Sequence, residues 1–235
     1  MRKFLFSGLF IFMFASLLIT PVYAASQTVY IAASRDNTLI QDLAGSLSSG
    51  SGPYLFVGRT NQTANSVRRS LLHFDVTSAV PSRARITSAQ LMLYLSKSQG
   101  FTGDISIHRV LSDWGQGVSY STGGSGAPAE LDDATWLHAY YPDFFWTTIG
   151  GDYLMGESAV IAVGPDKGSY IWESRNIIAD VESWIMNPEN NHGWILIGDE
   201  NSPQTVMRFS SREVTCSDRA SSTEVPPILI VTYKK

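Results

Sequence analysis

Residues 89–95 read Ala-Gln-Leu-Met-Leu-Tyr-Leu, and this stretch gives the clearest indication of the fold class. Its alternate residues are Ala89, Leu91, Leu93 and Leu95. Because successive side chains of a strand point to opposite faces, these four share one face. The stretch therefore predicts a β-strand that buries one face in a core.

Period-two patterns continue on both sides of this stretch. Residues 70–76 place Leu72, Phe74 and Val76 together, and residues 228–233 form a short apolar run. Shorter candidates with the same character lie at 29–32, 54–57, 105–111, 159–163, 170–172, 194–197 and 206–209. About ten short strands separated by Gly, Ser, Pro and Asn predict an all-β fold, a two-layer sandwich or barrel, rather than an alternating α/β fold.

One segment has a helical period instead. Apolar residues recur every three or four positions between 177 and 185. Ser174 or Asn176 is suited to cap the start of this helix, and Pro188 ends it. We expect one short helix that covers an end or an edge of the sandwich.

A long connection follows the strand candidate at 105–111. Residues 112–156 begin with a glycine-rich half and continue with a dense aromatic run: Trp136, Tyr140, Tyr141, Phe144, Phe145 and Trp146. A connection of this length is either functional or held against the surface by its own side chains.

The first 24 residues have the features of a secretory signal peptide. Two basic residues precede an almost wholly apolar run at 4–20, and residues 22–24 read Val-Tyr-Ala. Small residues at these positions suit signal peptidase, so we expect cleavage after Ala24 and a secreted, extracytoplasmic chain. An uncleaved anchor is the alternative, because the apolar run is only slightly shorter than the roughly 20 residues of a membrane helix.

The mature chain, residues 25–235, has the length of one domain. Without Arg2 and Lys3 it carries 15 basic and 21 acidic side chains, a net charge of −6. This charge disfavours nucleic acid as a partner, and cleavage would leave no membrane attachment. Cys216 is the single cysteine, so no internal disulfide forms and the stability must come from packing.

The sequence contains no recognisable catalytic constellation. It lacks a G-x-S-x-G motif, and the four histidines, His73, His108, His138 and His192, are scattered singly without a zinc spacing. The adjacent acidic residues Asp132-Asp133 and Asp199-Glu200 are a poor acid–base pair on a strand, because neighbours point to opposite faces. We therefore expect a non-enzymatic protein.

Calcium is the one cofactor that the residues suggest. Hard cations take oxygen ligands from loops, and the candidates are Asp36 and Asn37, Asp132 and Asp133, and Asp199 and Glu200 with Asn201. The spacing is not that of an EF-hand, so a structural calcium site would join distant segments. The alternative is that these are solvated loop carboxylates.

Aromatic and basic side chains are the candidates for ligand binding. Aromatic rings stack on the apolar faces of sugars, and the candidates are Trp114, Trp136, Tyr140, Tyr141 and Trp146. Arg69, next to Arg68, and Arg109 are candidates for contacting an acidic polysaccharide. The alternatives are that most of these rings pack against the sandwich, leaving one or two exposed, and that the arginines pair with local carboxylates.

The chain resembles exported proteins built on the DNRLRE domain. The resemblance spans nearly all of the mature chain, at residues 34–39, 69–76, 84–91, 108–114, 133–138, 150–153, 193–200, 208–213 and 227–233. The string that names the family is absent, and its nearest pieces lie at 36–39 and 211–213. The resemblance implies a jelly-roll-like antiparallel β-sandwich classed with the carbohydrate-binding modules, and assigns no ligand residues. It also places part of the 112–156 connection within the family pattern.

These observations predict a single exported, non-catalytic β-sandwich that binds polysaccharide at the cell surface or in the extracellular matrix. A structural or adhesive surface protein that contacts other proteins is the alternative. An enzyme that acts on polysaccharide is the third hypothesis.

Overall fold

The alternation at residues 89–95 lies within β6 (Arg85–Lys97), a strand of 13 residues. Ala89, Leu91, Leu93 and Leu95 are all buried in the core, as their shared face predicts. The structure, a computed structural model, describes residues 25–214 and 224–235. The predicted signal peptide and Cys216 lie outside the described residues.

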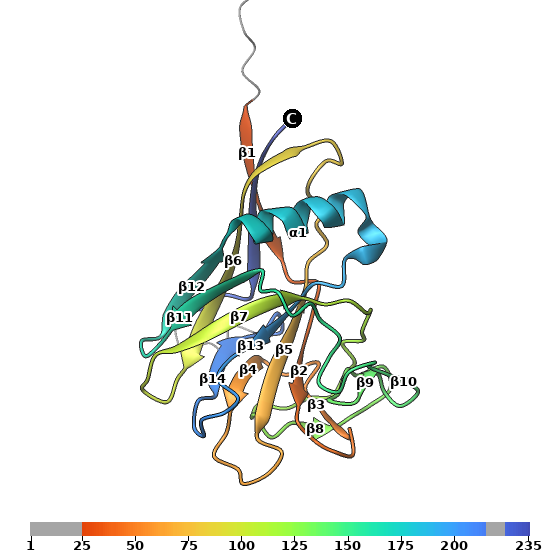
Figure 1. Cartoon of the computed structure of the whole chain (residues 1–235), viewed down its shortest axis with the longest axis vertical. Coiled ribbons are helices and arrows are strands. Elements are labelled where there is room, and N and C mark those ends of the chain that lie inside the picture. The colour runs from red at the N-terminus through yellow and green to blue at the C-terminus, as the bar shows by residue number, and fades with distance from the viewer. Residues whose placement is uncertain (1–24, 215–223) are drawn as a thin grey trace, which may run out of the picture.

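Two antiparallel layers form the body of the molecule (Figure 1). In the first layer, β6 pairs on one side with β12 and on the other with β15 and then β14, while β15 also pairs with β1. The bounds of these strands are β1 (Ser26–Ala32), β12 (Gly168–Glu173), β14 (Met207–Ser210) and β15 (Ile228–Lys234).

The second layer has the order β2-β5-β13-β7-β11, and all of its pairs are antiparallel. Its strands are β2 (Arg35–Ile40), β5 (Val67–His73), β7 (Gly103–Arg109), β11 (Ala159–Val163) and β13 (Trp194–Ile197). The predicted all-β antiparallel sandwich is thus confirmed.

One strand joins the two layers. In β4 (Tyr54–Arg59), the first four residues pair with β14, and Gly58 and Arg59 pair with β5. Gly58 stands at this change of layer with φ +107°, and a Cβ there would lie 2.7 Å from the Thr205 carbonyl oxygen. Only glycine fits that backbone, so the corner depends on this residue.

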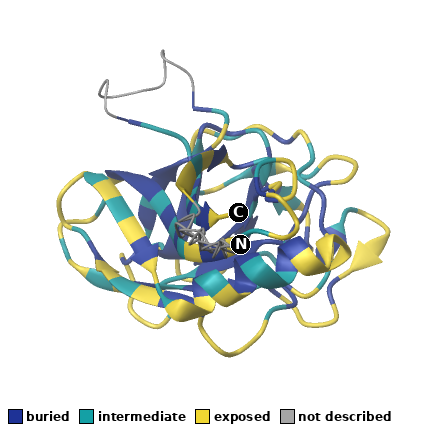
Figure 2. Cartoon of the chain, turned by 90° about the horizontal axis from the view of Figure 1, so that it is seen from above, coloured by how far each residue is buried: buried dark blue, intermediate teal, exposed yellow. Residues whose placement is uncertain are grey.

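The main core lies between the layers. Alternate residues of facing strands fill it, among them Leu72, Leu93, Ile107 and Phe209. Helix α1 (Arg175–Met186) closes one end and adds Trp184, and a short 3-10 helix, η1 (Pro188–Asn190), follows it (Figure 1). Figure 2 shows the strands largely buried and the helix exposed along one side.

The helix begins and ends close to the predicted positions. The Ser174 side chain accepts hydrogen bonds from the backbone amides of Asn176 and Ile177, at 3.0 and 3.1 Å. Ser174 is therefore the N-cap, and its hydroxyl satisfies amides that have no partner within the helix. The helix ends at Met186, and Pro188 follows the C-cap residue Asn187.

A second apolar cluster lies on the outer face of the second layer. We call it the loop cluster, because the connection at residues 112–156 packs there on β2, β5 and β13. Its buried members are Leu39, Val67, Leu71, Val110, Trp114, Ala134, Trp136, Ala139, Trp146 and Ile195. Consequently β5 and β13 are buried on both faces.

Short strands occur within and beside this connection. They pair in two small sheets, β3 with β8 and β9 with β10. Their bounds are β3 (Leu47–Ser48), β8 (Ala127–Pro128), β9 (His138–Tyr140) and β10 (Phe144–Phe145).

Candidate functional site

Arg69 and Glu200, predicted as separate candidates, bind each other. Arg69 Nε and Nη2 donate to the two carboxylate oxygens of Glu200 at 2.7 and 2.9 Å, and Nη1 donates to the Gly150 carbonyl at 2.8 Å. The guanidinium also lies over the Trp136 and Tyr153 rings, with its Cζ 4.9 and 5.5 Å from their centroids. Arg69 thus ties the 112–156 connection to β5, and Glu200 holds the guanidinium in place.

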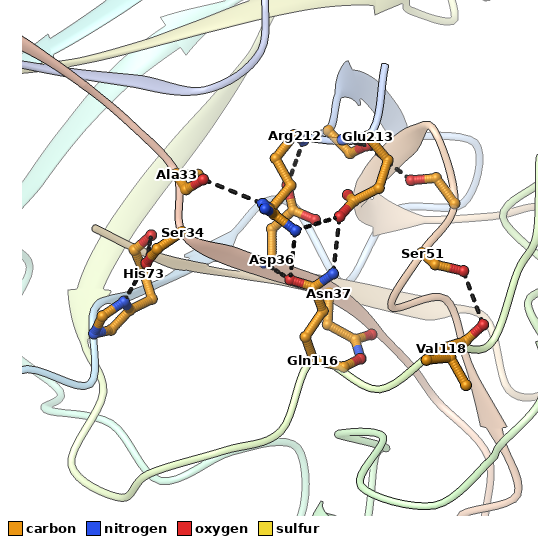
Figure 3. A network of polar contacts seen from close by, with 12 residues as sticks. Ala33, Ser34, Asp36, Asn37, Ser51, His73, Gln116, Val118, Arg212 and Glu213 are labelled. Atoms are coloured by element: carbon orange, nitrogen blue, oxygen red, sulfur yellow. Dashed lines mark hydrogen bonds and ion pairs between the residues drawn. The ribbon is translucent and has the colours of Figure 1, made fainter. Parts of the chain in front are cut away.

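Asp36 is buried and takes part in a polar network that joins three distant segments (Figure 3). Its Oδ2 accepts a 2.7 Å hydrogen bond from the Arg212 amide, and its own amide donates to Gln116 Oε1 at 3.2 Å. Gln116 Nε2 and Arg212 Nη1 both donate to Glu213 Oε1 at 2.8 Å. Burial, and secondly the charge of Glu213, raise the pKa of Asp36 well above its usual range. This network brings together the two segments that most resemble the DNRLRE string.

Asn37 and Asp199, two further predicted calcium ligands, are also engaged within the protein. Asn37 Nδ2 donates to Ser48 Oγ at 3.0 Å and to the Gln116 carbonyl at 2.8 Å. Asp199 Oδ1 accepts from the amides of Asn201 and Ser202, at 2.8 and 3.0 Å. Across residues 25–214 and 224–235, no three His, Cys, Asp or Glu side chains gather closely enough to hold a metal ion.

The predicted tryptophans are buried. Trp114 is 0% exposed, and its Nε1 donates to the His192 carbonyl at 2.9 Å. Trp146 is 5% exposed, and its Nε1 donates to the Thr135 carbonyl at 2.9 Å. Both rings belong to the loop cluster, so their faces contact protein instead of a ligand.

The predicted tyrosines are half-buried. The Tyr140 hydroxyl donates to Asp113 Oδ2 at 2.5 Å, and burial together with this hydrogen bond raises the pKa of Tyr140 to about 12. Tyr141 meets the His138 ring edge to face, with centroids 5.2 Å apart. The well-exposed rings of the aromatic run are instead Phe144 and Phe145, at 67% and 64%.

Arg109 lies at a hollow of about 220 Å³ between β7 and the start of α1. Its Nε is 3.6 Å from Asp180 Oδ1, an ion pair too long for a hydrogen bond. Asp180 Oδ2 accepts from Ser158 Oγ and Trp194 Nε1, at 2.5 and 2.8 Å. Burial raises the pKa of Asp180 above its usual value. The predicted binding residues Arg69 and Arg109 therefore do not form one site.

An open groove of about 570 Å³ runs across β13, β7 and β11. Strand register aligns Val160 with Ser106 and Ser106 with Ile197, so these three side chains form its floor. Residues 101–104 line one side and 198–205 line the other. Because β11, β7 and β13 come from distant parts of the sequence, no local motif indicates this floor. We call it the strand groove.

The strand groove is rich in hydrogen-bond acceptors. Asp104, Glu157 and Asp199 line it together with hydroxyl side chains, whereas none of its lining residues is Lys, Arg or His. Ser106 on the floor lies 2.9 Å from His108 Nε2. His108 Nδ1 lies 3.0 Å from the Leu154 carbonyl, which only accepts, so Nδ1 carries a proton. The Ser106 hydroxyl has two neighbouring acceptors, His108 Nε2 at 2.9 Å and the Ile197 carbonyl at 3.3 Å.

No family model matches the chain, and no curated protein matches it. Among the residues that the structure describes, no helix has the length and apolarity to cross a membrane.

Proposed function

We propose that this protein is an exported, non-catalytic β-sandwich that binds polysaccharide in the strand groove. The observation that carries the proposal is an open trough on a strand face, with an apolar and hydroxyl floor between acidic walls. A sugar chain offers apolar C–H faces to such a floor and hydroxyl donors to carboxylate acceptors. The resemblance to DNRLRE proteins supports the same reading.

The charges of the groove narrow the ligand class. The lining contains three carboxylates and no cationic side chain, so it disfavours an acidic polymer and suits a neutral or amino-sugar polymer. This differs from the acidic polysaccharide suggested by Arg69 and Arg109, because the Arg69 guanidinium is occupied by Glu200 and Arg109 lines a different hollow.

Calorimetric titration of the purified protein with neutral, amino-sugar and acidic oligosaccharides tests this proposal. We expect binding of a neutral or amino-sugar chain and none of the acidic one. Val160→Trp fills the floor and should weaken binding about tenfold or more. Ile171→Trp is the matched control, because Ile171 is also on a strand and is 42% exposed against 47% for Val160.

Three results would separate the alternatives. Absence of binding to every sugar, with capture of a second protein copy or another surface protein, supports the adhesive reading. An unfolding temperature lowered by EDTA would establish a structural calcium ion. Mass spectrometry of the exported protein should find Ala25 at its N-terminus; an intact N-terminus supports the membrane anchor instead.

The Ser106–His108 pair supports a second candidate function, hydrolysis of an ester carried by the bound polymer. Ser106 Oγ would attack the ester carbonyl while His108 Nε2 takes the hydroxyl proton and passes it to the leaving alcohol oxygen. Water would then hydrolyse the acyl-serine. Release of acetate from acetylated xylan, lost in Ser106→Ala, tests it; equal release by both proteins excludes it.

A further inference from the structure

Arg68 and Arg69 are adjacent on β5, but only one of them has a counter-charge. Arg69 pairs with the carboxylate of Glu200. Arg68 is 1% exposed and forms no ion pair with a carboxylate of residues 25–214 or 224–235. Burial lowers the pKa of Arg68 to about 10, so its guanidinium stays protonated at neutral pH. A buried cation without a counter-charge is costly, and a bound anion offsets that cost.

Carbonyl groups occupy most of the donors of Arg68. Its Nε donates to the Gly124 carbonyl, and its Nη1 donates to the carbonyls of Asn65 and Val67, both at 2.8 Å. Its Nη2 donates to Gln62 Oε1 at 3.1 Å. A guanidinium has five N–H groups, so one hydrogen of Nη2 has no partner within the described part of the chain. These neutral acceptors satisfy hydrogen bonds but do not cancel the positive charge.

Arg68 lines a hollow of about 410 Å³. The hollow adjoins the loop between β4 and β5, at the end of the molecule opposite α1 (Figure 1). Its other lining residues carry no charge, and four of them are exposed amides or hydroxyls: Gln62, Thr63, Asn65 and Ser125. Amide and hydroxyl groups donate to the oxygens of an anion. The hollow therefore combines one buried cation with several neutral donors.

The surrounding sequence adds no negative charge. The mature chain has a net charge of −6, yet positions 43 to 74 contain no Asp or Glu and three Arg residues. Asp42 lies just before this stretch, and its Oδ2 accepts hydrogen bonds from the amide and hydroxyl of Ser46, at 2.9 and 2.7 Å. An anion that enters the hollow is thus attracted by Arg68 without a competing carboxylate in the lining.

The arrangement of donors favours a tetrahedral oxyanion over a carboxylate. Arginine usually binds a planar carboxylate through two parallel N–H groups. In Arg68, carbonyls occupy Nε and both hydrogens of Nη1, so a single hydrogen of Nη2 is left. Phosphate and sulfate present oxygens in several directions, which suits single donors that come from different residues.

We propose that the hollow at Arg68 binds a phosphate or sulfate group, as the free ion or as an ester on a larger molecule. This inference goes beyond polysaccharide binding and is independent of it, because the hollow and the strand groove share no lining residue. The bound oxyanion supplies the counter-charge that Arg68 lacks. It therefore also stabilises the fold against unfolding.

Calorimetric titration of the exported protein, in a buffer without phosphate or sulfate, tests this proposal. The ligands are sodium phosphate, sodium sulfate, phenyl phosphate and sodium acetate, each compared with sodium chloride at the same ionic strength. Thr63→Glu adds a negative charge at an exposed position of the lining, and Arg68→Gln removes the positive charge. Thr148→Glu is the matched control, because Thr148 is an exposed threonine outside the hollow. Thermal unfolding verifies that each variant is folded.

We expect wild-type protein to bind phosphate or sulfate and not acetate. Thr63→Glu and folded Arg68→Gln should bind about tenfold more weakly or worse, and Thr148→Glu should bind like wild type. If Arg68→Gln does not fold, the exposed substitution Thr63→Glu decides the matter. Tighter binding of phenyl phosphate than of phosphate assigns the ester as the source, and weaker binding assigns the free ion.

Three results would overturn the proposal. They are wild-type protein that binds neither phosphate nor sulfate, acetate that binds as tightly as phosphate, and Thr63→Glu that binds like wild type. Each of them leaves the polysaccharide proposal intact, because that proposal is tested with Val160→Trp in the strand groove.

Discussion

The outer face of the second layer has two halves, one covered by a loop and one open to solvent. Over β2, β5 and β13, the 112–156 connection covers the sheet with a second apolar cluster. Over β7 and β11, the same face stays open as the strand groove. Arg69 and Glu200 lie between the halves, since Glu200 directly follows the groove wall and Arg69 stacks on the ring of Trp136.

Within one sheet, the covered half is thus expected to stabilise the fold and the open half to bind the ligand. The covered half uses large aromatic side chains to hold a connection that has little regular structure. The open half has Ser106, Val160 and Ile197 on the floor of the groove, and no loop covers them. Substitutions should therefore affect unfolding on the covered side and ligand binding on the open side.

The largest effect should follow Trp114→Ala on the covered half. Trp114 is fully buried, and Arg35 lies over its ring with Cζ 4.9 Å from the centroid. We expect the free energy of unfolding to fall by about 3–5 kcal/mol. Urea unfolding followed by tryptophan fluorescence measures it. A loss below about 1 kcal/mol would mean that the connection does not depend on this cluster.

A smaller effect should follow Glu200→Gln at the border between the halves. The variant leaves Arg69, whose side chain is 13% exposed, without its carboxylate partner. We expect a loss of about 2 kcal/mol in the free energy of unfolding. Glu173→Gln, at the exposed contact with Gln90, is the control and should cost close to nothing. If the two substitutions lowered the free energy of unfolding equally, the ion pair of Arg69 and Glu200 would not be what holds the connection on β5.

Acidification should weaken the covered half through His73. Burial, and secondly the charge of Arg35, lower the pKa of His73 from 6.5 to about 4. Unfolded histidine takes up a proton near pH 6.5 while the folded ring stays neutral, so this contribution to stability is lost as the pH falls from 6.5 toward 4.

We expect this single residue to account for about 2 kcal/mol by pH 5. Comparing wild type with His73→Asn at each pH isolates the contribution of His73. The raised pKa values of Asp36, Asp133 and Asp180 make the folded protein more stable as the pH falls, but they do so in both proteins. The two proteins should converge in stability as the pH falls. A constant difference between pH 7 and pH 5 would contradict the prediction.

The smallest effect should follow Val160→Ala on the open half. Val160 is 47% exposed, so its truncation removes little buried surface. We expect a change within about 0.5 kcal/mol in the free energy of unfolding. A larger loss in the same urea experiment would show that the floor of the strand groove also carries stability.

Much of the fold was predictable because the alternation of β6 and its neighbours reflects burial directly. The structure has strands at each of the ten predicted places and confirms α1 with its Ser174 cap. The main omission was β2, in which Asp36, Asn37 and Thr38 are all buried. The sequence of β2 shows no apolar alternation, because its buried residues are polar. They are buried because groups distant in sequence bond to them, such as the Arg212 amide to Asp36.

The site was less predictable than the fold. Packing of most aromatic residues was one of the two alternatives, and Trp114, Trp136 and Trp146 follow it. Phe144 and Phe145 are exposed on the short strand β10, and the strand groove depends on register between β11, β7 and β13. No local sequence pattern predicts either feature.

The pairing of β1 with β15 also determines how the molecule responds to mechanical force. Ser26 lies opposite Lys234, and the ladder continues from there to Ala32 opposite Ile228. A pull applied between residues 26 and 234 therefore loads the antiparallel ladder one pair at a time, as a zipper opens, instead of shearing all pairs together. The strand β1 would detach at low force, while β6 still holds β15 from its other side.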